Sequence, residues 1–211
     1  MKNIIFIAPP AGGKGTLSDS LVENFGYIHI STGDLLRSVS KTSEIGKKID
    51  ELISQGKFVS DEIVLSLLKD KLKTLKENES FILDGFPRNL SQAELLDKLL
   101  LELNMNIDAV YKIDVPYDVC LKRAIGRINC PNCKTTYNKF FKAPVVDGVC
   151  DKCGNSLVMR DDDNEITFKS RYDTYLDMTL PLCEFYKEKG ILVNIDGIND
   201  PYEQLVSMIN D

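Results

Sequence analysis

A glycine-rich turn near the amino terminus has the residue types needed to bind phosphate. It reads APPAGGKGT over residues 8–16 and follows a short apolar run at residues 3–8 that is typical of a buried parallel strand. Backbone N–H groups of such a turn, at the start of a helix, face an anion, and Lys14 would reach the terminal phosphates of a nucleotide. The usual phosphate-loop pattern is not met, because Ala8 replaces the first glycine and the threonine comes one position late, at Thr16.

Four of the six cysteines have the spacing of a zinc site. They form two C-x₂-C pairs separated by sixteen residues: Cys130, Cys133, Cys150 and Cys153. Each pair presents two thiolates to one side of a tetrahedron, and four thiolates leave no open position, so we expect a structural zinc ion. A disulfide pair is the alternative, which a cytoplasmic location disfavours. We expect Cys120 and Cys183 to be buried core residues.

Arginine is rare in this chain. Twenty lysines accompany only six arginines, which are Arg37, Arg88, Arg123, Arg127, Arg160 and Arg171. Arginine holds phosphate through a rigid two-pronged fork, whereas lysine acts as a mobile point charge. From composition alone, scattered surface charge and phosphate binding are about equally good explanations.

The elements that must position these residues alternate between strand and helix. Short apolar runs typical of buried strands occur at NIIFIA, YIHIST, SFILDGF, DAVYKIDV and ILVNID, and helical patterns follow most of them. NEITFKSRYDTYLDMTLPLCEFYKEKG predicts a long pair of helices. This order predicts an α/β fold with a parallel sheet covered by helices on both faces. The cysteine-rich segment, with few apolar runs, predicts a small insertion.

Composition sets further limits on function. The chain has 211 residues, of which 43% are hydrophobic, as expected for a soluble globular protein. No apolar run reaches the length of a membrane span, and MKNIIFIAPP is too short an apolar start for a signal peptide, so we expect a cytoplasmic protein without membrane partners. A formal charge of −6 argues against non-specific binding to nucleic acids.

Further motifs indicate a family. STGDLLR at residues 31–37, DGFPR at 84–88 with Gln92, and Gly-Arg at 126–127 accompany the glycine-rich turn. With these motifs the sequence closely resembles the adenylate kinases, nucleoside monophosphate kinases that interconvert ATP, AMP and ADP, from its first strand to its last helix. Their loop has the form GxPGxGKGT, so the Lys-Gly-Thr ending is the family's own variant.

Two alanines depart from the family's loop. Ala8 stands where the family has its first glycine, and Ala11 stands where Gly followed by a small residue is expected. If the backbone at these positions has positive φ, alanine costs on the order of 1 kcal/mol of strain. We expect the loop to bind nucleotide nonetheless.

The resemblance implies phosphoryl transfer from ATP to AMP by positioning and electrostatic stabilisation, with Mg²⁺ and closure of a lid. The implied catalytic residues are Lys14, Asp84, Arg88, Arg123, Arg127, Arg160 and Arg171. Asp84 ends an apolar strand where phosphate-loop proteins hold magnesium or its waters, although it could also cap a helix. Histidine has no catalytic role in this scheme, and we expect His29 to be a packed strand residue beside the site.

The resemblance also assigns residues to two nucleotide sites. The ATP side is Ala11, Gly12, Gly13, Lys14, Gly15, Thr16, Arg123, Arg127, Thr136, Tyr137 and Asn199. The AMP side is Thr32, Arg37, Lys57, Phe58, Val59, Gly85, Phe86, Pro87, Arg88, Gln92, Arg160 and Arg171. Thr32 and the Gln92 amide favour AMP as the acceptor, whereas the triphosphate base would be recognised mostly by backbone, which does not exclude GTP.

The implied organisation is a phosphate-loop kinase core with two insertions. The core comprises residues 1–30, 61–126 and 165–211, with a small helical AMP-binding domain at 31–60 and a zinc-ribbon-like lid at 127–164. We expect a monomer. The alternatives are a related kinase that uses GTP or acts on UMP or CMP, a nucleotide-binding regulator without activity, and a nucleic-acid-binding zinc module.

Overall fold

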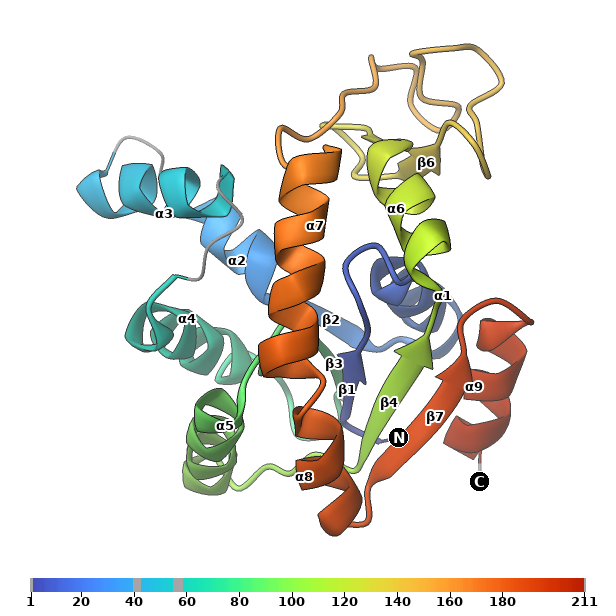
Figure 1. Ribbon diagram of the computed structural model, residues 1–211. Helices are drawn as coiled ribbons and strands as arrows, with labels where there is room; N and C mark the ends of the chain where they lie inside the picture. The colour runs from blue at the N-terminus through green and yellow to red at the C-terminus, as the bar shows by residue number, and fades with distance from the viewer. Residues whose placement is uncertain (1, 40–42, 55–58, 211) are drawn as a thin grey trace.

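The computed structural model describes residues 2–39, 43–54 and 59–210. A five-stranded parallel sheet forms its centre, with strand order β2-β3-β1-β4-β7 (Figure 1). The strands are β1 (Ile4–Ile7), β2 (Ile28–Ser31), β3 (Phe81–Asp84), β4 (Ala109–Asp114) and β7 (Leu192–Asp196). These are the five strands that the apolar runs predicted.

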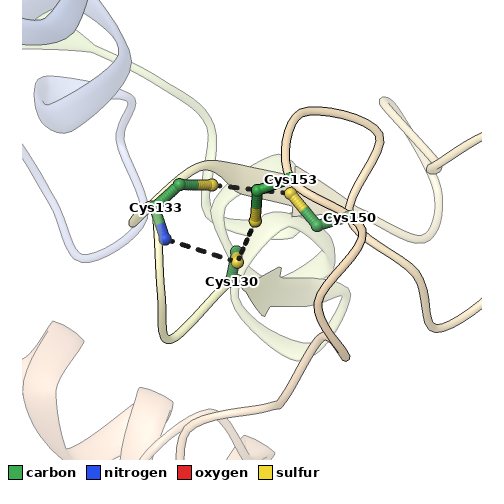
Figure 2. Close-up of side chains that lie close together, drawn as sticks. All are labelled: Cys130, Cys133, Cys150 and Cys153. Carbon is green, nitrogen blue, oxygen red and sulfur yellow. Dashed lines mark hydrogen bonds between the residues drawn. The ribbon is translucent and has the colours of Figure 1, made fainter.

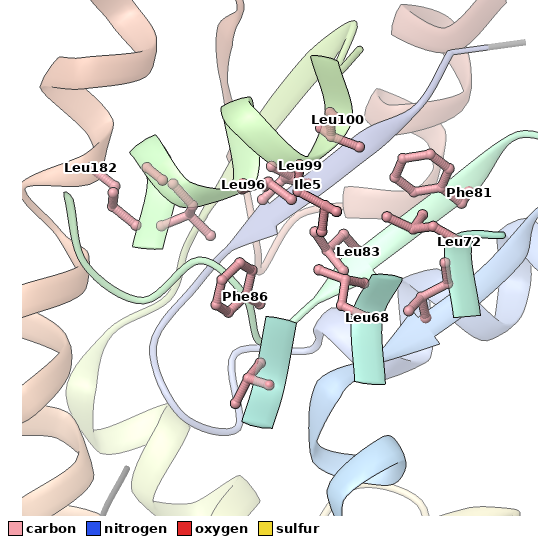
Figure 3. Close-up of a cluster of buried hydrophobic side chains, with 14 of the residues drawn as sticks. Ile5, Leu68, Leu72, Phe81, Leu83, Phe86, Leu96, Leu99, Leu100 and Leu182 are labelled. Carbon is pink, nitrogen blue, oxygen red and sulfur yellow. The ribbon is translucent and has the colours of Figure 1, made fainter. Parts of the chain in front are cut away.

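Alternate residues of the strands serve two hydrophobic layers, as the period of a β-strand requires. Ile5 and Ile7 pack in one layer with the helices of one face, whereas Ile4 and Phe6 pack in the other. Figure 3 shows the first layer, in which leucines of α4 and α5 surround Ile5 and Leu83. The predicted α/β fold with helices on both faces of the sheet is therefore confirmed.

The helices cover the sheet and build two outlying parts. They are α1 (Lys14–Phe25), α2 (Thr32–Ser38), α3 (Glu44–Ser54), α4 (Asp61–Leu72), α5 (Leu90–Glu102), α6 (Tyr117–Ile125), α7 (Glu165–Thr174), α8 (Leu182–Glu188) and α9 (Pro201–Asn210). In Figure 1, α4, α5 and α8 lie on one side of the sheet and α1 and α9 on the other. Within the described ranges, no helix combines the length and the apolar character needed to cross a membrane.

The predicted helix pair near the carboxyl terminus is joined by a π-helical turn, η1 (Tyr175–Thr179). Its wider period appears in the hydrogen bond from Leu180 N to Tyr175 O, 2.8 Å long and five residues apart. Only η1 and a two-residue turn, Leu180 and Pro181, therefore separate helices α7 and α8.

The cysteine-rich segment forms a separate small part above the sheet (Figure 1). Its antiparallel strands β5 (Arg127–Asn129) and β6 (Thr136–Asn138) pair with Arg127 opposite Asn138. This segment is joined to the rest of the chain by α6 on one side and α7 on the other.

Candidate functional site

The phosphate-binding turn lies between β1 and α1, at the carboxyl end of the parallel sheet. It is tightly folded: Gly12 N donates to Pro9 O at 2.9 Å, and a Cβ on Gly12 would lie 2.9 Å from the Ala8 Cβ. Gly13, at the N-cap of α1, has φ 97°, a conformation that favours glycine. The helix therefore begins with its free N–H groups at the turn, as an anion site requires.

The two alanines of the turn differ in conformation. Ala11 has φ 58°, in the left-handed region, whereas Ala8 is not among the positive-φ residues of the described chain. The expected strain therefore applies to Ala11 alone. Ala8 is 6% exposed and packs in the hydrophobic layer beneath the turn.

Lys14 and Asp84 lie together above the ends of the strands. The Lys14 ammonium donates to Ala8 O at 3.2 Å. Burial lowers the pKa of Lys14 below its ordinary value, against the attraction of the Asp84 carboxylate. For Asp84, burial would raise the pKa, but His29 and Lys14 together lower it, so the carboxylate is ionised at neutral pH.

His29 takes the expected place beside the site. It lies on β2, and its Nε2 is 3.5 Å from Asp84 Oδ2, too long for a strong hydrogen bond. Asp84 does not cap α5, because the side chain of Asn89 accepts from Gln92 N at the start of that helix. The helix that follows β3 is therefore capped by Asn89 and not by Asp84.

Repulsion between their charges links five of the predicted arginines, which are Arg37, Arg88, Arg127, Arg160 and Arg171. Burial, with the neighbouring Arg171, lowers the pKa of Arg88 to about 10. Burial, only partly offset by Asp162, lowers the pKa of Arg171. Burial and the positive charges of Arg127 and Arg37 lower the pKa of Arg160. Cations that depress one another's pKa in this way form a site for an anion.

Carboxylates hold several of these arginines. Arg127 makes a two-pronged pair with Asp163, with Nε 2.8 Å from Oδ2 and Nη2 2.5 Å from Oδ1. Burial would lower the pKa of Arg127, but this pair raises it. Arg171 Nη1 donates to Asp162 Oδ2 at 2.6 Å. Arg37 Nη2 likewise donates to Asp34 Oδ1 at 2.6 Å.

Arg123 reaches from α6 to the phosphate-binding turn. Its Nη1 is 3.8 Å from the position that a Cβ on Gly13 would occupy, and its Nη2 donates to Gly197 O at 3.3 Å. The loop that contains Gly197 is held by Asp196, whose carboxylate accepts from Asn199 N at 3.3 Å and from Asn199 Nδ2 at 2.7 Å. Asn199 is therefore close in the chain to the Arg123 contact, with its amide turned toward Asp196.

On the predicted AMP side, Thr32 and Gln92 are both held by hydrogen bonds within the protein. Thr32 is buried, and its hydroxyl donates to Asp84 O at 3.3 Å. The Gln92 side chain is 3% exposed; its Oε1 accepts from Arg88 N at 2.7 Å and its Nε2 donates to Asp61 Oδ1 at 2.6 Å. In this conformation the amide thus orients the backbone of Arg88.

The loop after β3 explains another glycine of the predicted AMP side. Gly85 has φ 84°, and a Cβ there would lie 2.9 Å from the Thr32 hydroxyl, so both conformation and space require glycine. Arg88 Nε donates to Gly85 O at 2.8 Å, and the Phe86–Pro87 peptide bond is cis.

Three other predicted AMP-side residues belong to the segment before α4. Val59 is buried at 6% exposure. Lys57 and Phe58 lie outside the described residues.

The residues predicted to contact the adenine of ATP lie on β6. Thr136 is exposed, and its hydroxyl donates to Asn129 Oδ1 at 2.9 Å. The Tyr137 side chain is buried, and its hydroxyl accepts from Asp151 N at 2.9 Å. The Tyr137 side chain thus packs inside the cysteine-rich segment, which leaves its backbone for any contact with a base.

The four paired cysteines converge on one point (Figure 2). Their sulfur atoms all lie within 4.8 Å of one another, with Cys130 Sγ 3.4 Å from Cys153 Sγ and Cys133 Sγ 3.5 Å from Cys150 Sγ. A tetrahedral zinc ion with Zn–S bonds of about 2.3 Å needs sulfur atoms about 3.8 Å apart. All six cysteines are free thiols, so the disulfide alternative is not met.

The carboxylates that hold the arginines were missed from the sequence. Asp162 and Asp163 belong to an Asp-Asp-Asp run that directly follows Arg160. Acidic residues beside a functional arginine are a usable signal, but their partners, Arg171 and Arg127, come from other elements. Asp61, which orients Gln92, and Asn138, which contacts α6, gave no signal of their own.

Comparisons with known proteins agree with this geometry. A family model described as adenylate kinase matches residues 6–191. The chain is 46% identical over 199 residues to an adenylate kinase of Archaeoglobus fulgidus, covering 94% of this chain and 92% of that protein. It is 44% identical over 195 residues to one of Thermodesulfovibrio yellowstonii, covering 92% and 91%, and 40% identical over 211 residues to one of Bacillus licheniformis, covering 98% and 97%. These matches do not favour a pyrimidine nucleotide kinase or a nucleic-acid-binding module. The chain belongs to the adenylate kinase family.

Proposed function

We propose that this chain catalyses the adenylate kinase reaction with the residues that converge above the phosphate-binding turn. In this reaction the terminal phosphoryl group of ATP passes to AMP, giving two ADP. The observation that carries the proposal is a cluster of buried cations near the phosphate-binding turn. Burial lowers the pKa of Lys14, Arg88 and Arg171, and the charge of Arg171 lowers the pKa of Lys14 and Arg88 further. Such a cluster favours an anion, and the charge of a transferring phosphoryl group is spread over its oxygens.

We propose that the ATP phosphates bind over residues 11–16, with Lys14 on the terminal phosphates. Support comes from the tight turn, the free N–H groups at the start of α1, and Arg123, which lies over Gly13. Arg127 completes the ATP side. The base lies against Arg123, between the β6 backbone at Thr136 and Tyr137 and the loop at Asn199.

The AMP phosphate, in this proposal, binds to Arg37 and Arg88. Gln92 supports this site because its Oε1 holds Arg88 N in place. Thr32, Gly85, Phe86, Pro87 and the segment 57–59 complete the AMP side. Gln92 would also recognise the adenine of AMP. Its contacts to Arg88 and Asp61 use one lone pair of Oε1 and one hydrogen of Nε2, so a second lone pair and a second hydrogen are available to the base.

Arg160 and Arg171 act on the transferring phosphoryl group from the lid side. Arg171 and Arg127 are held by Asp162 and Asp163, which keep the guanidinium groups extended and ready for phosphate. Phosphate oxygens can take over two-pronged contacts from a carboxylate because both present paired acceptors. Adenylate kinases are themselves a standard example of enzymes whose lid closes over the reaction.

Two metal ions belong to the proposal. Asp84, an ionised carboxylate beside Lys14, would hold Mg²⁺ or its water ligands, and Mg²⁺ would neutralise charge on the ATP phosphates. Cys130, Cys133, Cys150 and Cys153 would hold a structural Zn²⁺, which would supply folding energy to a segment with few buried apolar residues.

We further propose the division into a core (1–30, 61–126 and 165–211), an AMP-binding domain (31–60) and a zinc-binding lid (127–164). It is supported by the separate β5–β6 sheet and its small hydrophobic cluster around Cys130 and Tyr137. We also propose a cytoplasmic monomer that binds nucleotides rather than nucleic acids or membranes. The charge of −6 argues against binding to nucleic acids.

The two phosphate sites can be tested separately. In Arg88→Lys, the loss of the two-pronged contact should raise the KM for AMP about tenfold or more, with the KM for ATP within about twofold of its original value. Arg123→Lys should show the opposite pattern. Equal effects on both substrates in both variants would contradict the assignment of these arginines to separate sites.

A further inference from the structure

The carboxyl end of α6 lies at the junction of the core and the cysteine-rich segment. The last carbonyl groups of a helix have no partner within the helix. The last helical hydrogen bond runs from Gly126 N to Lys122 O. The next residue, Arg127, begins β5 and so does not donate its N–H to Arg123 O as it would in a continuing helix. A donor must come from outside the helix.

That donor is Asn138 of β6. Its Nδ2 donates to Arg123 O at 2.8 Å, and its Oδ1 accepts from Phe140 N at 2.9 Å. Beside it, Lys139 N donates to Gly126 O at 2.8 Å. Figure 1 shows β6 lying against the end of α6. The second lid strand is thus fixed to the last turn of α6 by a side chain and by the backbone.

Gly126 allows this close approach. Its φ of −90° is open to any residue, so conformation does not require glycine. Space does: a Cβ on Gly126 would lie 2.5 Å from Phe140 Cδ2 and 2.7 Å from Asn138 Oδ1. The side chains of Asn138, the last residue of β6, and of Phe140, just after it, therefore lie directly on the backbone of the helix end.

Arg123 connects this junction to the nucleotide site. Its carbonyl is held by Asn138, while its guanidinium lies over Gly13 of the phosphate-binding turn and donates to Gly197 O. One residue thus contacts the lid through its backbone and the triphosphate site through its side chain. Asn138 directly follows Thr136 and Tyr137 on β6, and these two residues are the proposed base contacts.

We infer that Asn138 is a positioning residue for the triphosphate site: its side-chain amide fixes the lid strand to Arg123 O and so sets the spacing between β6 and the Arg123 guanidinium. This inference rests on the proposed function of Arg123. It predicts an effect on ATP and not on AMP, because the side chain of Asn138 bonds to Arg123 and Phe140 and its backbone lies against Arg127 and Lys142. None of these residues belongs to the proposed AMP side.

The test compares three variants with the unaltered protein. Asn138→Ala removes the donor without adding charge. Asn138→Asp keeps the shape and the acceptor for Phe140 N but cannot donate to Arg123 O. Gly126→Ala disturbs the same contact from the side of the helix. The KM for ATP should rise about fivefold to tenfold in each variant, as expected for the loss of one hydrogen bond, with the KM for AMP within about twofold.

Lys139→Ala is the matched control, because the exposed Lys139 contributes its backbone N–H to the junction whatever its side chain. It should leave both KM values unchanged. Bound zinc, measured in every variant, should also be unchanged. Calorimetric titration with ATP compares the affinities of the variants without turnover. If the unaltered protein were inactive, the proposed function would be overturned, but the titration would still test this inference.

Three results would overturn the inference: an unchanged affinity for ATP in Asn138→Ala, equal losses for ATP and AMP, or a loss of ATP affinity that appears only together with a loss of zinc. The last result would make Asn138 a residue that serves only the folding of the lid.

Discussion

Ala11 is the residue at which this phosphate-binding turn is strained. Its φ of 58° places an alanine in the left-handed region, where the Cβ approaches the following carbonyl oxygen at a cost of about 1–2 kcal/mol. Ala8, in the same turn, avoids this conformation and packs in the core. The two departures from the family's loop therefore have opposite energetic consequences.

Replacing Ala11 with glycine should stabilise the protein. The relief of strain exceeds the added chain entropy of the unfolded state, so Ala11→Gly should raise the free energy of unfolding by up to about 1 kcal/mol. Ala8→Gly is the matched control. It should lower the free energy of unfolding by about 1 kcal/mol, because glycine increases the entropy of the unfolded chain and Ala8 has no strain to relieve. Urea denaturation measures both, and a loss of stability in Ala11→Gly would contradict the account of the turn.

Lys14 is the lysine on which the proposed phosphate contacts depend. Lys14→Met keeps the length of the side chain and removes the charge, so kcat should fall about 100-fold or more while the free energy of unfolding is maintained or rises, because burial already disfavours the charged form. The exposed Lys73 supplies the control: Lys73→Met should leave kcat unchanged. A steady-state assay that gives Lys14→Met a kcat within threefold of the original would show that this charge is not needed.

The residue types at the site could be predicted from the sequence, but their partners could not. Sequence motifs contain Lys14, Asp84 and the arginines, so their residue types are evident from the sequence alone. The pairs Arg127–Asp163 and Arg171–Asp162 depend on how β5 and α7 approach the loop that contains the two aspartates. Local sequence does not determine that tertiary approach. The hydrogen bond from the Gln92 amide to Asp61 could not be predicted from the sequence for the same reason.

At the scale of elements, the strands were the most predictable feature. A parallel strand buried on both faces is a continuous apolar run, and all five runs formed strands. The π-helical turn η1 was not predictable, because a single wider turn leaves no periodic signal between α7 and α8. The antiparallel β5–β6 pair was also missed, since its strands have three residues each.

The cysteine-rich segment should depend on its metal. Its buried cluster consists of Ile128, Cys130, Tyr137 and Cys150, too small a core for independent stability. Unfolding in a chelator followed by refolding without zinc should therefore lower the melting temperature, and elemental analysis of the untreated protein should give one zinc ion per chain.

Cys183→Ser is the control for this experiment, because Cys183 lies outside the four-cysteine cluster and packs against the core. It should retain the full zinc content, whereas Cys133→Ser should lose affinity for zinc. A melting temperature that is unchanged after removal of the metal would contradict a structural role for zinc.

At the scale of the whole molecule, the strand order brings the site together. The phosphate-binding turn follows β1, Asp84 ends β3, Ser31 ends β2 before Thr32, and the Gly197 loop follows β7. Because all five strands are parallel, these points meet at one edge of the sheet, where ligands of such folds bind. The alternation of elements predicted a parallel sheet; the order of its strands is a long-range property that no local pattern contains.

The cysteine-rich segment and the helices α2 and α3 lie on either side of this edge (Figure 1). Arg160, of the cysteine-rich segment, and Arg171, of α7, nevertheless both have their pKa lowered by burial and by the charges of Arg37 and Arg127. The positive residues of three parts of the chain therefore act on one region. This arrangement is suited to the proposed binding of two nucleotides whose phosphates meet between the parts.

The most direct test of the account is the formation of ADP from ATP with AMP, GMP, CMP or UMP as the acceptor, with Mg²⁺ and without it. The account predicts rapid turnover with AMP alone and only in the presence of Mg²⁺. Turnover with CMP or UMP in place of AMP, or no turnover by a protein that still binds ATP, would contradict it.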